Sequence, residues 1–295
     1  MLEGNYILRR ILGWIKDTFI LISLGIKILC RLLIPCFLLV IGGELIMDKT
    51  KNILIIGANS DIAKQCALIW ARRMDNLVLA SRDVAQLQKQ ETELLARGAG
   101  KIKIVEFDAT VRDDIHTLFE DCVSEIGNID LVLIAHGVLL SSESEEAKQL
   151  EPLEKFLYLN GLTTVLMIRK FMNEFSKSGK GHIAVISSIA GDRARPSNLE
   201  YGLSKQIVNF YMDGLRKEAR ESGVKLTLIK PGLIRTKMTD HLKVGMLFTS
   251  SRMAGRCVVK GIDASKFQFY VPAYWRLVSV VLKLIPYKIL AKLNV

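Results

Sequence analysis

From Asn52 onward, short apolar runs alternate with longer stretches in which apolar residues return at helical spacing. A short run of Ile, Leu and Val bounded by Gly or polar residues is typical of a buried strand in a parallel sheet. Such runs predict strands at 53–56, 77–80, 102–107, 131–135, 183–186, 225–229 and 267–271. Helices are predicted between them, at about 61–74, 83–97, 112–126, 150–171 and 201–221. This alternation predicts an α/β fold, a doubly wound parallel sheet of about seven strands flanked by helices, with sites at the carboxyl ends of the strands.

Two connections between these elements have compositions of their own. The stretch 141–146 is polar and acidic, so it is predicted to be a loop. Residues 237–262 are predicted to form a mobile apolar flap over a substrate, and its large apolar side chains are Met238, Leu242, Met246, Leu247 and Phe248.

Residues 1–48 form a hydrophobic N-terminal extension that differs from the rest of the chain. The stretch 18–43 is long enough to span a bilayer, but it is interrupted by Lys27, Arg31 and Pro35. A Lys or Arg in the middle of a span costs about 2.5–3.5 kcal/mol of insertion free energy. The extension is therefore either membrane-associated, as a signal anchor, re-entrant hairpin or amphipathic surface segment, or an over-long start before Met47. A cleaved secretory signal is disfavoured, because no clean small-residue cleavage site follows.

Residues 272–295 are predicted to form an amphipathic C-terminal segment after a domain at 49–271. Large apolar residues alternate there with Arg276, Lys283, Lys288 and Lys292. The net charge of the whole chain is +11, and the part from Arg252 onward carries eight Lys or Arg against one acid. A basic, apolar segment with aromatic residues suits a membrane interface, and a dimer contact or a helix that caps the core are the alternatives. Nucleic-acid binding is not predicted, because no base-stacking platform or recognition module is visible.

The five cysteines form no Cys-x-x-Cys pair and no metal-ligand spacing with histidine. Reduced thiols in a cytosolic setting are the simplest account, and a structural metal is not expected.

The first predicted strand leads into a turn of small residues that opens the first helix. Small residues let the backbone approach a pyrophosphate, and free N–H groups at a helix start attract its charge. Only the first glycine of the usual Rossmann-type turn is present, because Asp61 and Ala63 stand where two more are expected. An ordinary strand-to-helix turn is the alternative. The residues predicted to bind a dinucleotide here are Gly57, Asn59, Ser60, Asp61 and Ile62.

The ends of the next two strands add candidate cofactor residues. In a dinucleotide fold, an acid at the second strand's tip holds the ribose 2′-hydroxyl, whereas an Arg suits a 2′-phosphate. Arg82 therefore favours NADP(H), with NAD(H) as the alternative cofactor and a solvated loop charge as the alternative role. Asp108 is a candidate for contact with the adenine, and a turn or capping aspartate is the alternative.

Two later turns are candidates for the rest of the cofactor site. Ala135 and Gly137 would leave room for the cofactor, and His136 between them is expected to be structural rather than a base. The Pro231-Gly232 turn is a candidate for cupping the nicotinamide end, with Thr236 on its phosphate or amide. A sharp Pro-Gly turn without a ligand is the alternative.

Tyr201 and Lys205 stand four residues apart, so on a helix their side chains project from one face. A phenol has an ordinary pKa of about 10, and a cation beside it lowers that pKa toward the range useful for proton transfer. Ser188 lies thirteen residues before Tyr201, where a strand-end hydroxyl could reach the same carbonyl oxygen. Asn160 is a further candidate, because an Asn in mid-helix competes with the backbone. A solvated Tyr–Lys pair and a capped or solvated Asn are the alternatives.

These motifs occur in the order found in the short-chain dehydrogenase/reductases, which the chain resembles over about 51–272. The resemblance implies a hydride transfer from NAD(P)H to a ketone, with catalytic residues Asn160, Ser188, Tyr201 and Lys205. Tyr201 would donate a proton to the ketone oxygen and Ser188 would hold that oxygen. Lys205 would lower the pKa of Tyr201 and bind the nicotinamide ribose, and Asn160 would hold a water that links Lys205 to solvent. Family members are commonly dimers or tetramers.

The chain departs from the family pattern in the glycine turn and at 134–137, where Ile-Ala-His-Gly replaces the usual Asn-Asn-Ala-Gly. The stretches 134–137, 186–193 and 275–286 are similar to the reductase subunits of decaprenylphosphoryl-ribose 2′-epimerases and their bacterial relatives. That similarity implies a keto-sugar on a polyprenyl phosphate, a role in cell-envelope glycan synthesis, and a partner oxidase in a two-step epimerisation. It also implies a place on the cytoplasmic side of the membrane, with a cytoplasmic location as the alternative.

Substrates with a sugar phosphate would call for extra cations near the pocket, and the candidates are Arg193, Arg195 and Arg235. The alternative substrates are 3-oxoacyl or 3-ketosphinganine-type lipids, which need no such cations. A cofactor-binding regulatory protein without activity is disfavoured, because the four catalytic groups are all present.

Overall fold

The computed structural model describes residues 50–139, 149–240 and 245–290. The predictions for the N-terminal extension, for the loop at 141–146 and for Leu242 lie outside the described residues.

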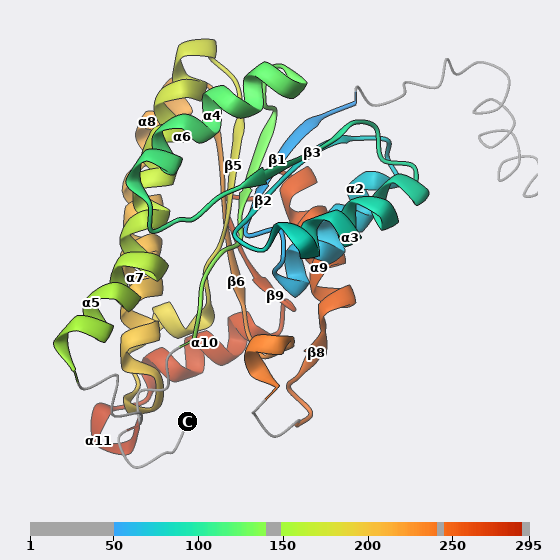
Figure 1. Ribbon diagram of the computed structural model, residues 1–295. Coiled ribbons are helices and arrows are strands. Elements are labelled where there is room, and N and C mark those ends of the chain that lie inside the picture. The colour runs from blue at the N-terminus through green and yellow to red at the C-terminus, as the bar shows by residue number, and fades with distance from the viewer. Residues whose placement is uncertain (1–49, 140–148, 241–244, 291–295) are drawn as a thin grey trace, which may run out of the picture. The chain divides into compact units, whose positions relative to one another are not determined.

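Seven parallel strands form one sheet in the order β3-β2-β1-β4-β5-β6-β9 (Figure 1). The strands are β1 (Asn52–Ile56), β2 (Asn76–Ser81), β3 (Ile102–Glu106), β4 (Leu131–Ile134), β5 (His182–Ile186), β6 (Lys225–Pro231) and β9 (Gln268–Val271). The predicted doubly wound sheet is therefore confirmed, with strand ends that differ from the predicted ones by one or two residues.

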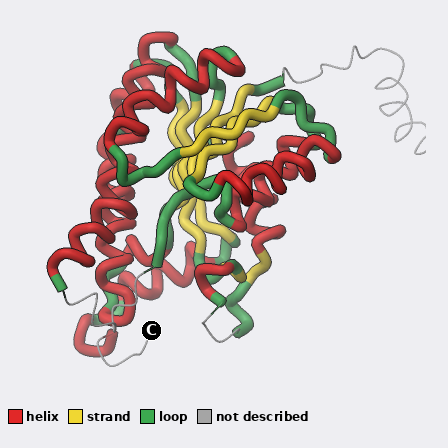
Figure 2. Tube along the Cα trace, viewed as in Figure 1, coloured by secondary structure: helices red, strands yellow, loops and turns green. Residues whose placement is uncertain are grey.

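Helices cover both faces of the sheet, as the tube in Figure 2 shows. One face is covered by α2 (Asp61–Ala71), α3 (Val84–Ala96) and α9 (Ser251–Asp263). The other face is covered by α4 (Arg112–Ile126), α6 (Thr163–Ser178), α7 (Leu199–Gly214) and α8 (Arg216–Glu221). The helix α5 (Leu150–Leu157) precedes α6.

Alternate side chains of each strand supply the two cores, as the two-residue period of a strand requires. In β1, Leu54 and Ile56 belong to the core beneath α4, α6 and α7, whereas Ile53 and Ile55 belong to the core beneath α2, α3 and α9. Strands buried on both sides carry apolar residues at every position, which explains the continuous runs in the sequence.

The strand order reverses between β1 and β4, whose ends pair at Ile56 and Ile134. From β1 the chain continues to β2 and β3 on one side, and it then returns to β4 on the other side. The connections that leave the two neighbouring strand ends therefore diverge, and a crevice opens between them. This switch point places the candidate site residues at the carboxyl edge of the sheet.

Two predicted helices are interrupted. The predicted helix at 150–171 consists of α5, a π-helical turn at Tyr158–Leu162 and α6, and the π-helical turn contains Asn160. The predicted helix at 201–221 is divided into α7 and α8 at Leu215.

The predicted flap at 237–262 is wrong for its second half. Residues 251–263 form α9, which begins at the N-cap Ser250, whose hydroxyl oxygen accepts a hydrogen bond from Met253 N (3.2 Å). This helix packs on α2 through small and β-branched residues, namely Ala254, Gly255, Val258 and Val259. Before α9, β7 (Ile234–Arg235) and β8 (Thr249–Ser250) pair in a small sheet that the sequence pattern did not predict.

The C-terminal segment contains α10 (Trp275–Leu284) and α11 (Tyr287–Leu290). One face of α10 is buried through Trp275, Ser279 and Leu282, so this face caps the core, as one of the alternatives expected. The opposite face exposes large apolar side chains, namely Leu277, Val280, Val281 and Leu284. Among the described residues, no helix combines the length and the apolar character that crossing a bilayer requires.

Candidate active site

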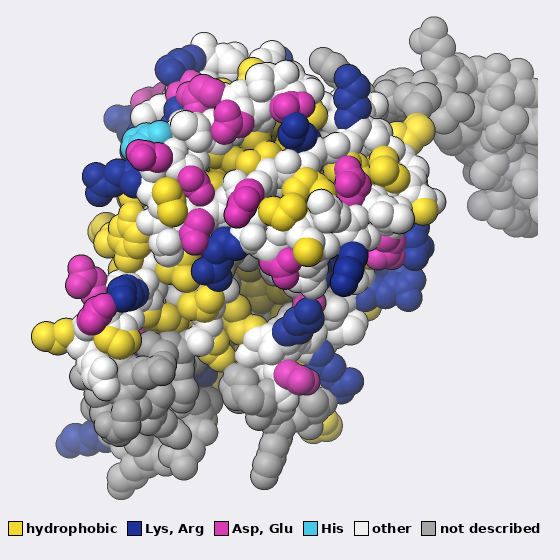
Figure 3. Space-filling model, in the orientation of Figure 1, with side chains coloured by type: hydrophobic (Ala, Val, Ile, Leu, Met, Phe, Trp, Pro, Cys, Tyr) yellow, Lys and Arg dark blue, Asp and Glu magenta, His cyan; other side chains and the backbone are white. Residues whose placement is uncertain are grey.

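A cavity of about 380 Å³ lies at the carboxyl ends of the strands. A recess with an apolar floor opens near the middle of the face seen in Figure 3. Every residue predicted to be catalytic or to bind the cofactor, except Asn160, lines the cavity: Gly57, Asn59, Ser60, Asp61, Ile62, Arg82, Asp108, Ala135, Gly137, Ser188, Tyr201, Lys205, Pro231, Gly232 and Thr236. The structure thus brings together residues that lie up to 179 positions apart, from 57 to 236, in the sequence.

The turn after β1 needs glycine at its first position. Gly57 has φ +78°, and a Cβ there would lie 2.5 Å from the backbone N of His136. The N–H groups of Gly57 and Ala58 both donate to Ala80 O at the end of β2 (2.9 and 3.2 Å). The Asn59 amide donates to Ser81 Oγ at 3.0 Å, which fixes the turn to the same strand end. The backbone is therefore held open for close approach by a ligand.

The start of α2 presents free N–H groups beside this turn. Ser60 is the N-cap, but its side chain forms no capping hydrogen bond. The first intrahelical bond runs from Lys64 N to Ser60 O (2.9 Å), so the N–H groups of residues 61–63 have no partner within the helix. Such an end favours an anion. The Asp61 carboxylate accepts a hydrogen bond from Lys237 N (2.7 Å), so this residue also joins α2 to the turn at 237–239.

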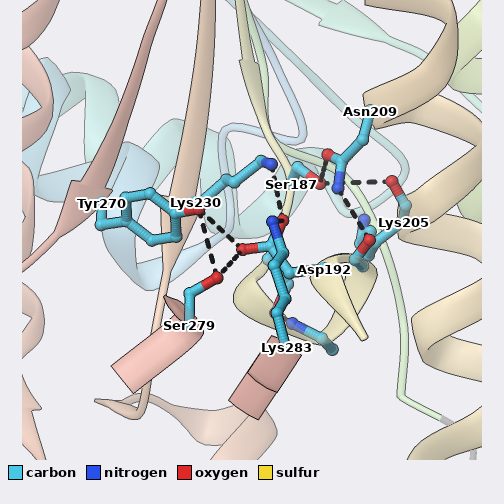
Figure 4. Close-up of polar contacts among 11 residues, drawn as sticks. Ser187, Asp192, Lys205, Asn209, Lys230, Tyr270, Ser279 and Lys283 are labelled. Atoms are coloured by element: carbon cyan, nitrogen blue, oxygen red, sulfur yellow. Dashed lines mark hydrogen bonds and ion pairs between the residues drawn. The ribbon is translucent and has the colours of Figure 1, made fainter. Parts of the chain in front are cut away.

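The Ser188 turn is locked to α7 by Asn209. Ser187 Oγ donates to Asn209 Oδ1 (2.7 Å), and Asn209 Nδ2 donates to Gly191 O (3.2 Å), as Figure 4 shows. A Cβ at Gly191 would lie 2.6 Å from Asn209 Nδ2, so the turn fits the helix only with glycine there. Sequence reasoning missed Asn209, although it is a mid-helix Asn four residues after Lys205 and therefore carried the same signal as Asn160.

Tyr201, Lys205 and Ser188 meet at the cavity wall. Lys205 Nζ lies 5.5 Å from the centroid of the Tyr201 ring. Burial raises the pKa of Tyr201 to about 12, against the opposing effect of a hydrogen bond with Ser188. Burial also lowers the pKa of Lys205 to about 8. The loss of solvation of the phenolate outweighs the effect of Ser188, so the pKa is raised, and the expectation that Lys205 lowers the pKa of Tyr201 stays a prediction.

Asn160 lies behind the cavity wall, fully buried in the π-helical turn. Its Oδ1 accepts a hydrogen bond from Val138 N (2.9 Å) and its Nδ2 donates to Phe156 O (3.2 Å). Gly137 separates it from Lys205: a Cβ at Gly137 would lie 2.8 Å from Asn160 Oδ1 and 3.5 Å from Lys205 Nζ. A π-helical turn in an otherwise regular helix often marks a functional position. The solvated alternative for Asn160 is wrong.

His136 is structural in its contacts, as expected. Its Nε2 lies 3.1 Å from Leu159 O, which can only accept, so this nitrogen carries the proton. Burial, together with the charge of Lys205, lowers the pKa of His136 to about 3. The ring therefore stays neutral, and it joins the end of β4 to the π-helical turn that holds Asn160.

Arg82 and Asp108 lie at the tips of adjacent strands in the cavity wall. Asp108 Oδ1 accepts hydrogen bonds from Thr110 N (2.8 Å) and Thr110 Oγ1 (2.7 Å). Burial acts to raise the pKa of Asp108, but these hydrogen bonds and the charge of Arg82 outweigh it and lower the pKa. These contacts are those of a turn aspartate, which was the alternative role for Asp108. Asp108 also lines the cavity.

The Pro231-Gly232 turn is closed from behind by α10. A Cβ at Gly232 would lie 2.0 Å from the ring of Trp275, so only glycine fits between this ring and the cavity. Thr236 forms a capping box with Thr239 at the start of the short turn Lys237–Thr239.

A buried ionic network lies beside the Ser188 turn and was not predicted. The Asp192 carboxylate accepts hydrogen bonds from Lys230 Nζ (2.6 Å), Tyr270 Oη (2.8 Å) and Ser279 Oγ (2.5 Å) (Figure 4). The side chains of Asp192 and Lys230 are only 3% and 6% exposed. Lys283 lies 3.8 Å from the same carboxylate. This network joins the turn after Ser188 to β6, β9 and α10.

The three arginines proposed for a sugar phosphate lie outside the lining of this cavity. Arg193 Nη2 donates instead to Ile285 O at 3.4 Å, toward the C-terminal segment. Among the described residues that line the cavity, the Lys and Arg residues are Arg82, Lys205 and Lys237.

A doubly wound sheet with an anion-attracting turn after β1, and a Ser, a Tyr and a Lys lining the same cavity, is the arrangement expected of a nicotinamide-dependent oxidoreductase. Residues 51–245 match the family model described as short chain dehydrogenase, and the chain belongs to this family. It is therefore an NAD(P)-dependent oxidoreductase.

Similar proteins include an uncharacterised oxidoreductase of Listeria monocytogenes, which is 31% identical over 201 residues that span 66% of this chain and 78% of the relative. An uncharacterised oxidoreductase of Mycobacterium tuberculosis is 26% identical over 227 residues, which span 76% of this chain and 89% of the relative. The fold is similar to that of a short-chain dehydrogenase from Sphingobium yanoikuyae in complex with NADPH. That structure is 22% identical with a TM-score of 0.68, over 83% of this chain and 96% of the other. A bulky-bulky ketone specific alcohol dehydrogenase from Comamonas testosteroni has a TM-score of 0.68 and 21% identity, over 83% of this chain and 95% of the other.

The residues at the cavity fit a nicotinamide dinucleotide. Glycine at position 57 lets the turn pack directly on the backbone at the end of β4, and the free N–H groups of α2 beside this turn suit a pyrophosphate. The Oδ1 of Asn59 is buried without a hydrogen-bond partner among the described residues, so an acceptor is available beside the turn.

Proposed function

We propose that this protein reduces a ketone to an alcohol with NADPH, through Asn160, Ser188, Tyr201 and Lys205. The observation that carries the proposal is that Ser188, Tyr201 and Lys205 line one cavity, where Ser188 acts to lower the pKa of Tyr201 and Lys205 Nζ lies 5.5 Å from the Tyr201 ring. The dinucleotide-type turn lines the same cavity.

The chemistry of each residue follows from its surroundings. Ser188 Oγ accepts a hydrogen bond from Ala190 N (3.1 Å), so its own proton is available to bind a carbonyl oxygen. Because the pKa of Tyr201 is about 12, the phenol is protonated at neutral pH and can donate its proton to that oxygen. The bound nicotinamide supplies the hydride. Lys205 holds the nicotinamide ribose, and Asn160 supports a water through which Lys205 exchanges protons with solvent.

For the cofactor, the turn from Gly57 to Ile62 would hold the pyrophosphate and Asp108 the adenine. The small residues Ala135 and Gly137 leave room along the end of β4. The turn at Pro231 and Gly232, with Thr236, would hold the nicotinamide end. Arg82, at the tip of β2, is placed to bind a ribose 2′-phosphate and so to favour NADPH over NADH.

Replacement of Arg82 by Asp is expected to raise the KM for NADPH about tenfold or more, with little change for NADH, because a charge-assisted hydrogen bond to the 2′-phosphate is lost. Steady-state kinetics with both cofactors measures the ratio. Lys89→Asp is the matched control, since it makes the same charge change on α3 outside the cavity lining. Equal losses for the two cofactors would remove Arg82 from the recognition of the 2′-phosphate.

We further propose a lipid-linked ketone as substrate, a keto-sugar on a polyprenyl phosphate, with 3-oxoacyl or 3-ketosphinganine-type lipids as the second candidate. The exposed apolar face of α10, with Arg276 and Lys283 on the same helix, supports work at a membrane surface. Lys237 at the cavity is available for a phosphate of the substrate. A place on the cytoplasmic side of the membrane, a partner oxidase and a dimeric or tetrameric state belong to the same proposal.

The test is oxidation of NADPH by the full chain with three kinds of ketone: a polyprenyl-phosphate keto-sugar, a 3-ketolipid and a small soluble ketone. We expect the highest kcat/KM with the polyprenyl-phosphate keto-sugar. The highest value with the 3-ketolipid would replace the keto-sugar by the second candidate. Equal values with the small ketone would remove the lipid from the proposal, and no oxidation with any ketone would remove the reductase activity itself.

A further inference from the structure

A second cavity, of about 300 Å³, lies between α2, the end of α3 and α9. It shares no lining residue with the first cavity. Four of its seven lining residues are arginines, and none is an acid: Arg72, Arg97, Arg252 and Arg256, with Gln65, Leu68 and Ile69. We call this cavity the arginine pocket. In Figure 3, Lys and Arg side chains gather at the right of the view, beside the helices labelled α2 and α3 in Figure 1.

The arginine pocket is built on packed helices. Its residues on α2 lie three, four and seven positions after Gln65, so they share one face of the helix, and Arg72 is the C-cap. Arg252 and Arg256 lie one turn apart on α9. The two helices touch at Gly255, where a Cβ would lie 2.5 Å from Gln65 Cβ. The close helix crossing therefore fixes the backbone positions from which the arginines project.

The charges in the arginine pocket are poorly compensated. Arg97 pairs with Glu93 (3.2 Å), but within the part of the chain that the structure describes, the side chains of Arg72, Arg252 and Arg256 have no ion pair or hydrogen bond. The nearby Asp263 is occupied by two hydrogen bonds from Arg73 (3.1 and 2.9 Å). Guanidinium groups gathered without acids repel one another, and an anion among them would remove this repulsion.

We propose that the arginine pocket binds a phosphate group, either of a soluble phosphate ester or of a phospholipid headgroup. A guanidinium group binds phosphate oxygens through two parallel hydrogen bonds, and several arginines around one space match a doubly charged anion better than a carboxylate. The half-buried Leu68 and Ile69 offer an apolar floor to the alcohol part of an ester. A single-stranded nucleic acid is a poor fit, because the lining has no aromatic residue on which bases would stack.

The experiment compares the wild-type chain with the double variant Arg252→Gln/Arg256→Gln. Binding of pyrophosphate is measured by calorimetry with NADPH present at a saturating concentration, so that the first cavity is filled. Binding to vesicles is measured by co-sedimentation, with vesicles of phosphatidylglycerol and phosphatidylcholine in equal parts and vesicles of phosphatidylcholine alone. The control is Lys217→Gln/Arg220→Gln, which removes two charges from α8 on the opposite face of the sheet.

We expect the double variant to lose affinity about tenfold for each arginine, whereas the control keeps wild-type affinity. Neither variant should change the kcat of ketone reduction, and circular dichroism checks that both fold. A loss confined to pyrophosphate identifies a soluble phosphate ester as the ligand, and a loss confined to the anionic vesicles identifies a headgroup. Equal losses in the double variant and the control would show that net charge alone attracts anions, and no binding in either assay would equally overturn the proposal.

Discussion

Replacement of Tyr201 by Phe is expected to lower the kcat of ketone reduction by about two to four orders of magnitude. The substitution removes only the phenol hydroxyl, in a residue that lines the cavity together with Ser188. The ring and its contact with Lys205 remain, so the Kd for NADPH should stay unchanged. Single-turnover kinetics gives the chemical rate, and fluorescence titration gives the Kd.

Tyr211→Phe is the matched control for this measurement. Tyr211 is also on α7, and its hydroxyl accepts a hydrogen bond from Arg169 Nε (2.7 Å) outside the cavity lining. Its loss should leave kcat within a factor of about two, because the hydroxyl lies outside the cavity and water can replace it as a partner of Arg169. If Tyr201→Phe behaved like Tyr211→Phe, another group would have to donate the proton.

The raised pKa of Tyr201 agrees with the proposed direction of the reaction, the reduction of a ketone. With a pKa of about 12, Tyr201 is protonated and serves as an acid, as reduction of a ketone requires. Oxidation of the alcohol would need the phenolate, so its rate should rise with pH. Lys205, with a pKa of about 8, carries its full charge only below that pH, so the cation beside the phenol weakens as pH increases. Both effects come from burial, which disfavours the charged form of each group.

The sequence predicted the sheet and the cavity well because both depend on local patterns. Each apolar run favoured a strand of a parallel sheet, and the switch point of such a sheet brings strand-end residues such as Gly57 and Ser188 to one edge. The spacing of Tyr201 and Lys205 needed only a helix to bring them together. These inferences required no knowledge of distant contacts.

The features that were missed depend on distant partners. The π-helical turn at Asn160 is stabilised in part by a hydrogen bond from Val138 N, 22 residues away. The second half of the predicted flap at 237–262 is the helix α9, whose Gly255 packs against α2, about 190 positions earlier in the chain. The arginine pocket and the Asp192 network likewise join segments that are remote in sequence, and no local pattern predicts which charges will meet.

Among the residues whose partners are distant in sequence, Asp192 has the largest expected effect on stability. Asp192→Ala would leave the Lys230 ammonium group buried without its carboxylate, because both side chains are at most 6% exposed. Removing one partner of a buried ion pair costs about 3–5 kcal/mol of the free energy of unfolding. Chemical denaturation at neutral pH measures this loss. Glu151→Ala, which breaks an exposed pair with Lys155 on α5, is the control and should leave the free energy of unfolding unchanged within the error of the measurement.

The pH dependence gives a second measurement of the same interaction. Burial acts to raise the pKa of Asp192, but the hydrogen bonds from Lys230, Ser279 and Tyr270 and the charge of Lys230 outweigh it, so the pKa is lowered. A carboxyl group with a lower pKa in the folded state stabilises the fold above its unfolded pKa of about 3.9. This stabilisation is lost as the pH falls through the folded pKa. The stability difference between wild type and Asp192→Ala should therefore be constant above about pH 4 and shrink below it.

Adding Lys230→Met to Asp192→Ala separates the loss of the pair from the cost of the remaining charge. If the unpaired ammonium group causes most of the instability, the double variant should regain part of the lost free energy, since an apolar side chain fills the same buried space. The Asp192 carboxylate lies at the end of the turn that begins after Ser188. Any loss of kcat in Asp192→Ala should therefore be regained together with stability in the double variant. A double variant less stable than Asp192→Ala would contradict this explanation. It would mean that the Lys230 ammonium group finds water or another acceptor once the carboxylate is gone. The hydroxyl groups of Tyr270 and Ser279 would then be the part of the network that holds the turn.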